Sequence, residues 1–417
     1  MTRFIALLPL ALLVSACEQT STAPIRVGVL HSQTGTMAIS EVPVAEATLM
    51  AIAEINADGG LLGRPIEPVV VDGASDEERF GLVAEQLIVD DGVDVIFGGW
   101  TSASRKEIKP VVEAHDHLLL YPVQYEGMES SDNIVYLGAT PNQQLLPALK
   151  WFFDNRGTRF FLVGSDYIYP HSTNATASDY ITYLGGTIVG ESYVALGGTA
   201  VEPIVAAIQD SGAQVIVNTI NGDTNLAFFG ALRAAGITSA DIPTLSLSLS
   251  EAELASMDVE HVYGDYAAWN YFQSEAHHTN LSFVERFQGT HGAERTLSDP
   301  MAAAYSGVYL WAQAVIDAGT STPGNVLAHI GNQHFEGPQG DLYVDAGNLH
   351  TWKSAKIGRI RRDGQFDLVW QSEAIIHPVP YPPSRSHNQW HEFLQRHFRG
   401  WGERWNNIDG AVMEDVH

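Results

Sequence analysis

Residues 95–104 read Val-Ile-Phe-Gly-Gly-Trp-Thr-Ser-Ala-Ser and give the clearest indication of the fold. An apolar run ends in two glycines, an aromatic residue and hydroxyl residues, and a helical pattern follows over 105–114. This order is typical of a strand, a tight turn and a helix N-terminus. Gly98 and Gly99 let the backbone turn and approach another segment closely. The first helical turn has N–H groups without intrahelical acceptors, which suit a carbonyl oxygen or an anion.

Two interpretations of this stretch are open. In the first, Trp100 supplies a flat wall, and the helix start with Thr101 and Ser102 holds a small polar ligand. In the second, the stretch is an ordinary strand-to-helix turn in which Thr101 or Ser102 caps the helix. The other strand ends of the chain help to choose between them.

Strands and helices are expected to alternate along most of the chain. A first series has strands at 25–30, 66–71, 93–97 and 118–121, separated by helices at 41–56, 76–90 and 105–114. A second series begins at residue 141, with helices at 141–153, 174–184, 201–211 and 224–235 and strands at 159–163, 187–193, 215–219 and 243–247. Strands separated by helices of this length indicate parallel sheets.

We therefore expect an α/β protein with two Rossmann-like lobes joined by several crossovers and separated by a cleft. The expected boundaries are 25–140 plus 270–340 for lobe 1, 141–269 plus 341–377 for lobe 2, and 378–417 for a C-terminal extension. Ligands bind outside the carboxyl ends of the strands in such sheets, so the loops that follow the strands are candidate binding residues.

The N-terminus predicts export. Arg3 precedes an apolar run at 4–14 that is too short to span a bilayer, so residues 1–16 are expected to be a signal peptide. Small residues precede Cys17, the only cysteine, and this resembles the lipobox of bacterial lipoproteins. We expect lipid attachment at Cys17, a polar tether over 17–24, and a location in the periplasm or cell envelope. The alternative is a plain signal peptide with an incidental cysteine.

Composition excludes several kinds of function. The chain has 22 Lys and Arg against 49 Asp and Glu, a net charge of −27, so nucleic acid is not an expected partner. It has no nucleotide-binding glycine motif, no Gly-x-Ser-x-Gly, and no histidine spacing typical of a metal site beyond His387 and His391, which fit a solvated helix face. We expect no cofactor, no metal and no catalytic residue.

Polar and aromatic side chains follow several predicted strands. Those assigned to ligand binding are Trp100, Thr101, Ser102, Tyr121, Gln124, Tyr167, Tyr169, Asn221, Asp223 and Glu251, and Ser248 lies beside the last of them. Each one alone also fits turn or capping chemistry. Together they are neutral or acceptor-rich and include no Arg or Lys to clamp a carboxylate. This set favours a small neutral ligand with N–H donors and one carbonyl, in which Asp223 accepts an N–H and Trp100 packs on the ligand plane.

Long motifs at these positions carry a family resemblance. They include Tyr121-Pro122-Val123-Gln124-Tyr125-Glu126-Gly127, Ser165-Asp166-Tyr167-Ile168-Tyr169-Pro170, Asn218-Thr219-Ile220-Asn221-Gly222-Asp223 and Ala268-Trp269-Asn270-Tyr271-Phe272-Gln273-Ser274. Over roughly 25–381 the chain resembles the urea-binding proteins of bacterial ABC importers, which are type I periplasmic binding proteins. The resemblance implies a two-lobed clamshell that closes on urea or a short-chain amide and delivers it to a membrane permease.

Other functions remain open at this stage. The chain also resembles the sensors that control amidase operons, so an amide or urea sensor that reports to a regulator or receptor is the alternative to transport. An enzyme is not expected, because no nucleophile set or metal cluster occurs. Beyond residue 383 an apolar stripe at helical spacing docks either on the protein itself or on a partner, and it consists of Trp390, Leu394, Phe398, Trp401 and Trp405.

The lone cysteine gives the first prediction. We expect the mature chain to begin at Cys17 and to carry acyl chains there, because two or more chains anchor a protein stably to a membrane. Intact-mass analysis of protein extracted from membranes checks this. A soluble mature species that keeps Cys17 unmodified, or that starts after it, contradicts the assignment.

Overall fold

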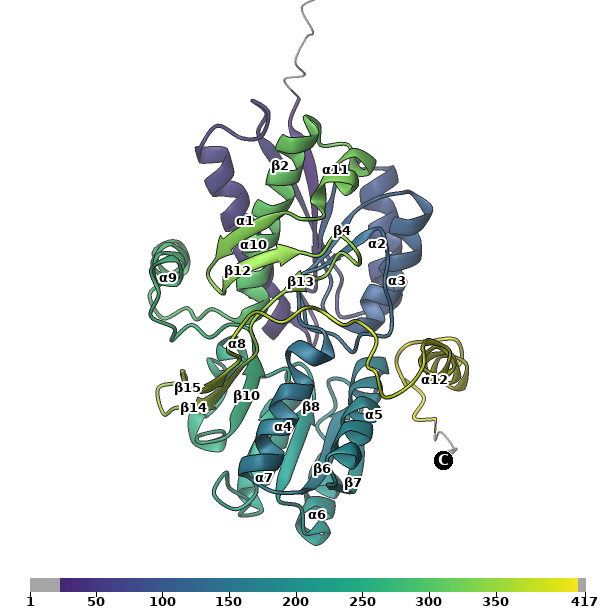
Figure 1. Cartoon of the computed structure of the whole chain (residues 1–417), viewed down its shortest axis with the longest axis vertical. Coiled ribbons are helices and arrows are strands. Elements are labelled where there is room, and N and C mark those ends of the chain that lie inside the picture. The colour runs from purple at the N-terminus through teal and green to yellow at the C-terminus, as the bar shows by residue number, and fades with distance from the viewer. Residues whose placement is uncertain (1–22, 412–417) are drawn as a thin grey trace, which may run out of the picture.

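The computed structural model describes residues 23–411, and Figure 1 shows two lobes stacked along the long axis. The expected signal peptide and Cys17 lie outside the described residues. Within residues 23–411 no helix is long and apolar enough to cross a membrane.

Lobe 1 contains a five-stranded parallel sheet in the order β2-β1-β3-β4-β5. Its strands are β1 (Ile25–His31), β2 (Ile66–Asp72), β3 (Ile96–Gly98), β4 (Leu119–Tyr121) and β5 (Ile134–Tyr136). Its helices are α1 (Ala38–Ala57), α2 (Glu77–Val89), α3 (Ser102–Ala114), α9 (His278–His291), α10 (Asp299–Ala318) and α11 (Pro323–Ile330). Except for the partly exposed edge strand β2, these strands are buried on both faces, which explains why their apolar runs lack alternation.

Lobe 2 contains a seven-stranded sheet in the order β15-β14-β10-β9-β8-β6-β7, in which β14 and β15 are antiparallel to their neighbours. The strands are β6 (Arg159–Ser165), β7 (Thr187–Val194), β8 (Val215–Thr219), β9 (Thr244–Ser246), β10 (Tyr266–Trp269), β14 (Lys356–Ile360) and β15 (Phe366–Gln371). The helices are η1 (Pro141–Gln143), α4 (Leu145–Asn155), α5 (Ile168–Tyr183), α6 (Glu202–Ser211), α7 (Thr224–Ala234), α8 (Glu251–Leu254) and η2 (Val259–His261). The two α/β lobes expected from the sequence are confirmed.

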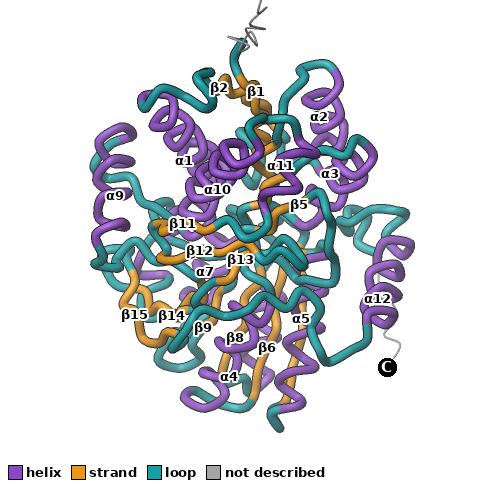
Figure 2. Tube along the Cα trace, turned by 45° about the horizontal axis from the view of Figure 1, so that its top comes forward, coloured by secondary structure: helices purple, strands orange, loops and turns teal. Residues whose placement is uncertain are grey.

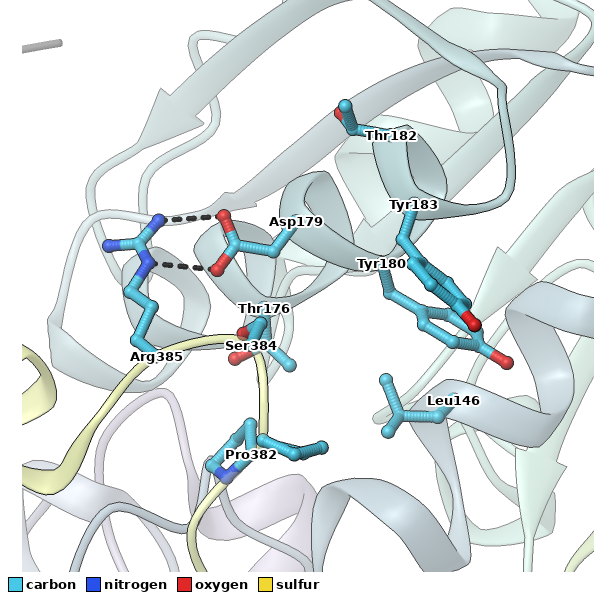
Figure 3. A pocket seen from close by; sticks show the side chains of 10 residues that line it. Leu146, Thr176, Asp179, Tyr180, Thr182, Tyr183, Pro382, Ser384 and Arg385 are labelled. Atoms are coloured by element: carbon cyan, nitrogen blue, oxygen red, sulfur yellow. Dashed lines mark hydrogen bonds and ion pairs between the residues drawn. The ribbon is translucent and has the colours of Figure 1, made fainter.

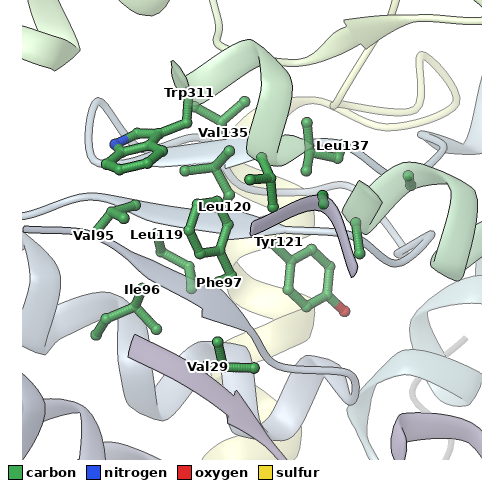
Figure 4. Close-up of a cluster of buried hydrophobic side chains, with 14 of the residues drawn as sticks. Val29, Val95, Ile96, Phe97, Leu119, Leu120, Tyr121, Val135, Leu137 and Trp311 are labelled. Atoms are coloured by element: carbon green, nitrogen blue, oxygen red, sulfur yellow. The ribbon is translucent and has the colours of Figure 1, made fainter. Parts of the chain in front are cut away.

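Each sheet is sandwiched between apolar layers. Figure 4 shows part of the lobe 1 core, where Trp311 of α10 packs edge-on against Phe97 of β3 with ring centroids 5.6 Å apart. In lobe 2, β6 and β8 send side chains to two separate clusters on opposite faces of the sheet. The strands are therefore held from both sides, which fixes the positions of their carboxyl ends.

A third, three-stranded antiparallel sheet changes one expected boundary. It consists of β11 (His334–Gly337), β12 (Gly340–Val344) and β13 (Thr351–Trp352). Leu342 and Val344 belong to the lobe 1 core, so residues 341–352 lie with lobe 1 and not, as the sequence suggested, with lobe 2. The reason is local pairing: β12 folds straight back on β11, so the chain does not leave lobe 1 before residue 353.

Three chain crossings connect the lobes, and one side chain joins them. The crossings lie between β5 and α4, between β10 and α9, and between β13 and β14. Asn270, on the second crossing, donates from Nδ2 to the carbonyl oxygens of Gln143 on the first (3.0 Å) and Ser354 on the third (2.8 Å). Figure 2 shows these connections at the junction of the two lobes. The hinge thus consists of three chain segments that are bonded to one another and must bend together.

The C-terminal extension docks on the protein itself. It forms α12 (His387–Gly400), whose buried Trp390 and Leu394 join a cluster with Ile168 of α5. The helix ends at Gly400, so Trp401 and Trp405 follow it in an irregular segment and do not continue the helical stripe that the spacing suggested. Tertiary contacts, and not helical periodicity, place those two indoles.

Gly98 lies at the end of β3, where the backbone turns toward α3 and passes close to Leu30. Its φ is +150°, and an added Cβ would lie 1.9 Å from the carbonyl oxygen of Leu30, whereas at Gly99 (φ +78°) the nearest atom would be 3.4 Å away. Gly99→Ala should lower the free energy of unfolding by about 1–2 kcal/mol through backbone strain alone. Gly98→Ala should cost about 1–3 kcal/mol more because of the overlap. Guanidinium chloride denaturation of both variants measures the difference, and equal losses would show that the overlap relaxes.

Candidate functional site

The polar loops predicted from the sequence meet where the two lobes face each other. Trp100 of lobe 1 donates from Nε1 to Oδ1 of Asn221 in lobe 2, at 3.4 Å. Gln124 of lobe 1 donates from Nε2 to the Leu247 carbonyl oxygen (2.9 Å) and to Oγ of Ser248 (3.0 Å), both in lobe 2. All these side chains are buried, so the lobes are closed upon one another.

Several buried polar atoms at this meeting point lack a well-formed hydrogen bond to the described part of the chain. They are Gln124 Oε1, Tyr169 OH and Thr173 Oγ1. Burial raises the pKa of Tyr169 to about 12, and hydrogen-bonding contacts with the Ser248, Gln124 and Thr173 side chains limit that rise, so these polar groups face one another. A buried polar group without a well-formed hydrogen bond costs about 1–3 kcal/mol, so this group of atoms is suited to bind a polar ligand.

The N-terminus of α3 adds donors from lobe 1. Thr101 is the N-cap residue, and its Oγ1 accepts from the backbone N–H of Ser104 at 3.0 Å. This leaves the N–H groups of Ser102 and Ala103, which have no intrahelical acceptor at a helix start. The capping interpretation and the ligand-binding interpretation of this stretch are therefore compatible, because Thr101 caps the helix while the two N–H groups stay available.

The Ser102 hydroxyl, in contrast, is engaged below the site. It donates to Glu126 and accepts from Nη1 of Arg105 at 3.0 Å. Arg105 also donates from Nη2 to Glu126 (3.2 Å) and from Nε to Glu129 (2.9 Å), and Lys106 Nζ lies 2.8 Å from Glu129. The four charges cancel; Arg105, Glu126 and Glu129 are buried, and the side chain of Lys106 is 6% exposed. The backbone N–H of Ser102, and not its hydroxyl, is the group left for a ligand.

The ion cluster is formed by Arg105, Lys106, Glu126 and Glu129, and aromatic rings enclose it. The Arg105 guanidinium lies over the rings of Tyr125 (4.5 Å) and Tyr121 (4.9 Å). Burial alone would raise the pKa of Glu129, but Arg105 and Lys106 hold that pKa well below its ordinary value. This low-dielectric arrangement makes Glu129 a permanent carboxylate that positions α3.

His350 connects the same loop to the hinge. Tyr125 OH and His350 Nε2 are 2.5 Å apart, and His350 Nδ1 lies 2.6 Å from the Asn348 carbonyl oxygen. Burial lowers the pKa of His350 to about 4, so the ring is neutral near pH 7, with Nδ1–H donating to Asn348 and Nε2 accepting from Tyr125. The loop after β4 is thereby tied to the segment that precedes the third crossing.

The remaining predicted residues differ in position. Tyr121 is buried and donates its phenol proton to the Trp100 carbonyl oxygen, so it supports the turn. Tyr167 is buried beside Tyr169, with ring centroids 6.2 Å apart. Asp223 is exposed at the rim, where it accepts from the Thr36 hydroxyl of lobe 1. Asp223 is therefore outside the buried group.

Glu251 makes other contacts than the residues around Tyr169. Its Oε1 accepts from the backbone N–H of Gln273 (2.8 Å) on the second crossing, its buried Oε2 has no well-formed hydrogen bond to the described part of the chain, and burial raises its pKa to about 8. Ser248, three residues earlier, is the residue of this loop that contacts Gln124. Thr173 was not anticipated, although it follows Tyr169 by four residues and so shares its helix face.

The comparisons with known proteins agree with this geometry. A family model described as the periplasmic binding protein domain matches residues 25–387. The chain belongs to the periplasmic binding protein family. Members of this family act outside the cytoplasm, and the family assignment supports a substrate-binding role.

Solved structures share the fold. A solute-binding protein of an ABC transporter from R. palustris, in complex with 4-hydroxybenzoate, has a TM-score of 0.76 and 22% identity, over 84% of this chain and 97% of that chain. The branched-chain amino acid transporter substrate binding protein LivJ from Streptococcus pneumoniae, in complex with isoleucine, has a TM-score of 0.73 and 20% identity, over 85% of this chain and 100% of that chain. These neighbours confirm the type I clamshell of the periplasmic binding protein.

A curated relative matches only in part. A limonene hydroxylase from Geobacillus stearothermophilus is 31% identical over 127 residues, which are 30% of this chain and 23% of that protein. This chain thus aligns with less than a quarter of that relative. Among residues 23–411, no group of three or more His, Cys, Asp or Glu side chains is arranged to hold a metal ion.

The ion cluster gives a prediction on stability. Glu129→Gln leaves the buried Arg105 and Lys106 with one carboxylate and should lower the free energy of unfolding by about 3–5 kcal/mol. Asp154→Asn, which breaks the exposed Lys150–Asp154 pair, is the control and should cost less than about 1 kcal/mol.

The same variant should show a defined pH dependence. The pKa of Glu129 is lower in the folded than in the unfolded chain, so its contribution is present above its ordinary value of 4.5 and is lost as the pH falls through the folded pKa. The stability difference between wild type and Glu129→Gln, measured by denaturation between pH 7 and acid, should therefore shrink at low pH. A difference that is constant over this range would contradict the assigned charge state.

Proposed function

We propose that this protein is the extracytoplasmic substrate-binding protein of an ABC importer, and that it captures urea or a short-chain amide between its lobes. It would be tethered to a membrane through Cys17 and would deliver its ligand to permease subunits. The observation that carries the ligand class is the group of buried neutral atoms at Gln124, Tyr169 and Thr173 that lack a well-formed hydrogen bond.

Charge supports a neutral ligand. The two cations nearest the α3 start, Arg105 and Lys106, are matched by Glu126 and Glu129. An anionic ligand would therefore have to be bound by N–H groups and hydroxyls alone, without the bidentate arginine contact that suits a carboxylate. A neutral ligand needs no such partner.

Hydrogen-bond chemistry supports an amide. A carbonyl oxygen would accept from the Ser102 and Ala103 N–H groups, and amide N–H groups would donate to Gln124 Oε1 and Tyr169 OH. The lobes already touch at Trp100 and Asn221 and at Gln124 and Ser248, so a ligand held between these contacts would have to be a molecule of a few heavy atoms. Trp100 would contribute an apolar wall, as aromatic side chains commonly do at ligand sites.

Isothermal titration calorimetry of the full chain tests the proposal. Urea, acetamide and formamide should give saturable heats, and leucine and benzoate should give none. Binding of leucine or benzoate, with no binding of urea or the amides, would overturn the assigned ligand class.

Two variants separate the buried group from the exposed rim. Tyr169→Phe removes one hydroxyl and should weaken binding of urea by about ten- to a hundredfold, since an unpaired N–H costs about 1–3 kcal/mol. Asp223→Ala removes an exposed carboxylate that bonds Thr36, and should weaken binding by no more than about tenfold. The reverse order of effects would make Asp223 the direct acceptor of a ligand N–H, as its sequence motif suggested.

A further inference from the structure

The C-terminal extension runs from the hinge onto lobe 2. The Pro380 carbonyl oxygen accepts from the backbone N–H of Met128 in lobe 1, at 2.7 Å. Arg385 then forms a two-point ion pair with Asp179 of α5, at 2.8 and 2.9 Å, which Figure 3 shows beside Pro382. Together with the docking of Trp390, this fixes α12 on the flank of lobe 2.

After α12 the chain turns back to the junction of the lobes. We name residues 404–407 the strap. On lobe 2, the Trp405 carbonyl oxygen accepts from the Ile168 N–H (2.9 Å), and Asn407 donates from its backbone N–H to the Asp166 carbonyl oxygen (3.0 Å) and from Nδ2 to Oδ2 of Asp166 (2.8 Å). The strap is thus bonded to the segment that starts α5 and leads to Tyr169.

The strap also contacts lobe 1. Lys106 Nζ lies 4.9 Å from the centre of the Trp405 ring, and Arg404 Nη2 lies 3.6 Å from Glu78 Oε1. The backbone N–H groups of Trp405 and Asn406 face the carboxyl group of Glu77, at the start of α2. The contacts of the strap therefore reach both lobes at a place away from the three hinge crossings.

The strap is bonded on both sides. Lobe 2 holds it by three hydrogen bonds between 2.8 and 3.0 Å, two of them made by peptide groups. Lobe 1 holds it by the buried carboxyl group of Glu77, which faces two backbone N–H groups, and by two individually weak contacts, a cation over a ring and a long ion pair at a half-exposed site. Opening of the cleft must therefore break the contacts of the strap with one of the two lobes.

We propose that the strap is a fourth connection between the lobes, which favours the closed cleft and positions the lobe 2 side of the ligand site. Its bonds to Asp166 and Ile168 fix the backbone just before Tyr169, and its contact with Lys106 joins the ion cluster beneath Ser102. The strap acts on the ligand through these two segments and through Trp405, which packs against the cluster that contains Tyr167 and Tyr169.

The distance between the lobes tests this proposal directly. Spin labels on cysteines introduced at Leu82 in α2 and Tyr183 in α5, which are 74% and 82% exposed, report that distance in the full chain carrying Cys17→Ser. Without ligand, the double variant Trp405→Ala/Asn407→Ala should give a longer and broader distance distribution than the otherwise identical unaltered chain. Ile408→Ala, at a 64% exposed position next to the strap, is the matched control and should change nothing.

A second variant excludes the explanation that the substitutions in the strap act by misfolding the C-terminal extension. Glu77→Ala removes the lobe 1 carboxyl group that faces the strap and leaves the extension unchanged, so it should also lengthen the distance. Circular dichroism establishes that each variant is folded. Distance distributions of both strap variants that match that of Ile408→Ala would overturn the proposal.

Urea binding gives an independent readout, which rests on the proposed function. If the strap favours the closed state, its loss should weaken urea binding by about tenfold, because apparent affinity scales with the population of the competent state. If the unaltered chain does not bind urea, the ligand assignment is wrong, but the distance measurement still tests whether the strap favours the closed cleft. If the distances lengthen and the urea affinity is unchanged, the proposal that the strap positions the ligand site is wrong.

Discussion

Much of lobe 1 near the cleft depends on the buried pairing of two cations with two carboxylates. Arg105 and Lys106 come from the first two turns of α3, whereas Glu126 and Glu129 come from the loop after β4. Removing any one charge leaves an uncompensated ion in a medium of low polarizability. The ion pairs therefore hold the helix start and the loop together. This contact fixes the positions of Trp100, Ser102 and Gln124, which lie on these two segments.

Closure of the lobes, in contrast, rests on contacts that water can replace. The hydrogen bonds between Trp100 and Asn221 and between Ser40 and Glu253 join neutral donors to polar acceptors across the cleft, and on opening both partners become hydrated. Such exchanges have a small net free energy. A ligand that bonds both lobes then shifts the balance by its differential affinity for the closed state. Rigid lobes whose closure has a small net free energy suit a binding protein, because ligand binding can then determine whether the cleft is open or closed.

The sequence predicts the sheets and the ends of their strands well, because apolar runs and glycines act locally. Gly98 and the helix after it are examples. It fails where position depends on distant partners. Ser248 and Glu251 look equivalent in the sequence, yet only Ser248 meets Gln124, since α8 turns Glu251 toward the second crossing. Strand β5 is not among the predicted strands, and it is defined by its pairing with β4.

The positions of the C-terminal aromatic residues also depend on distant partners and could not be predicted from the sequence. A stripe from Trp390 to Trp405 fits helical spacing, but the helix ends at Gly400, where the Glu403 N–H turns back to the Phe398 carbonyl oxygen (2.8 Å) and Gly402 has a φ of +73°. Beyond this turn Trp401 packs against His171 and Trp405 lies against Lys106. Both partners belong to segments more than two hundred residues earlier, one in each lobe. Periodicity reports only which residues share a face, so it cannot distinguish an apolar stripe that covers one lobe from one that spans two. Whether the stripe covers one lobe or two is decided by contacts with distant residues. Trp405 contacts Lys106 in lobe 1, and residues 405 and 407 bond to Ile168 and Asp166 in lobe 2, so the end of the chain lies across the junction of the lobes.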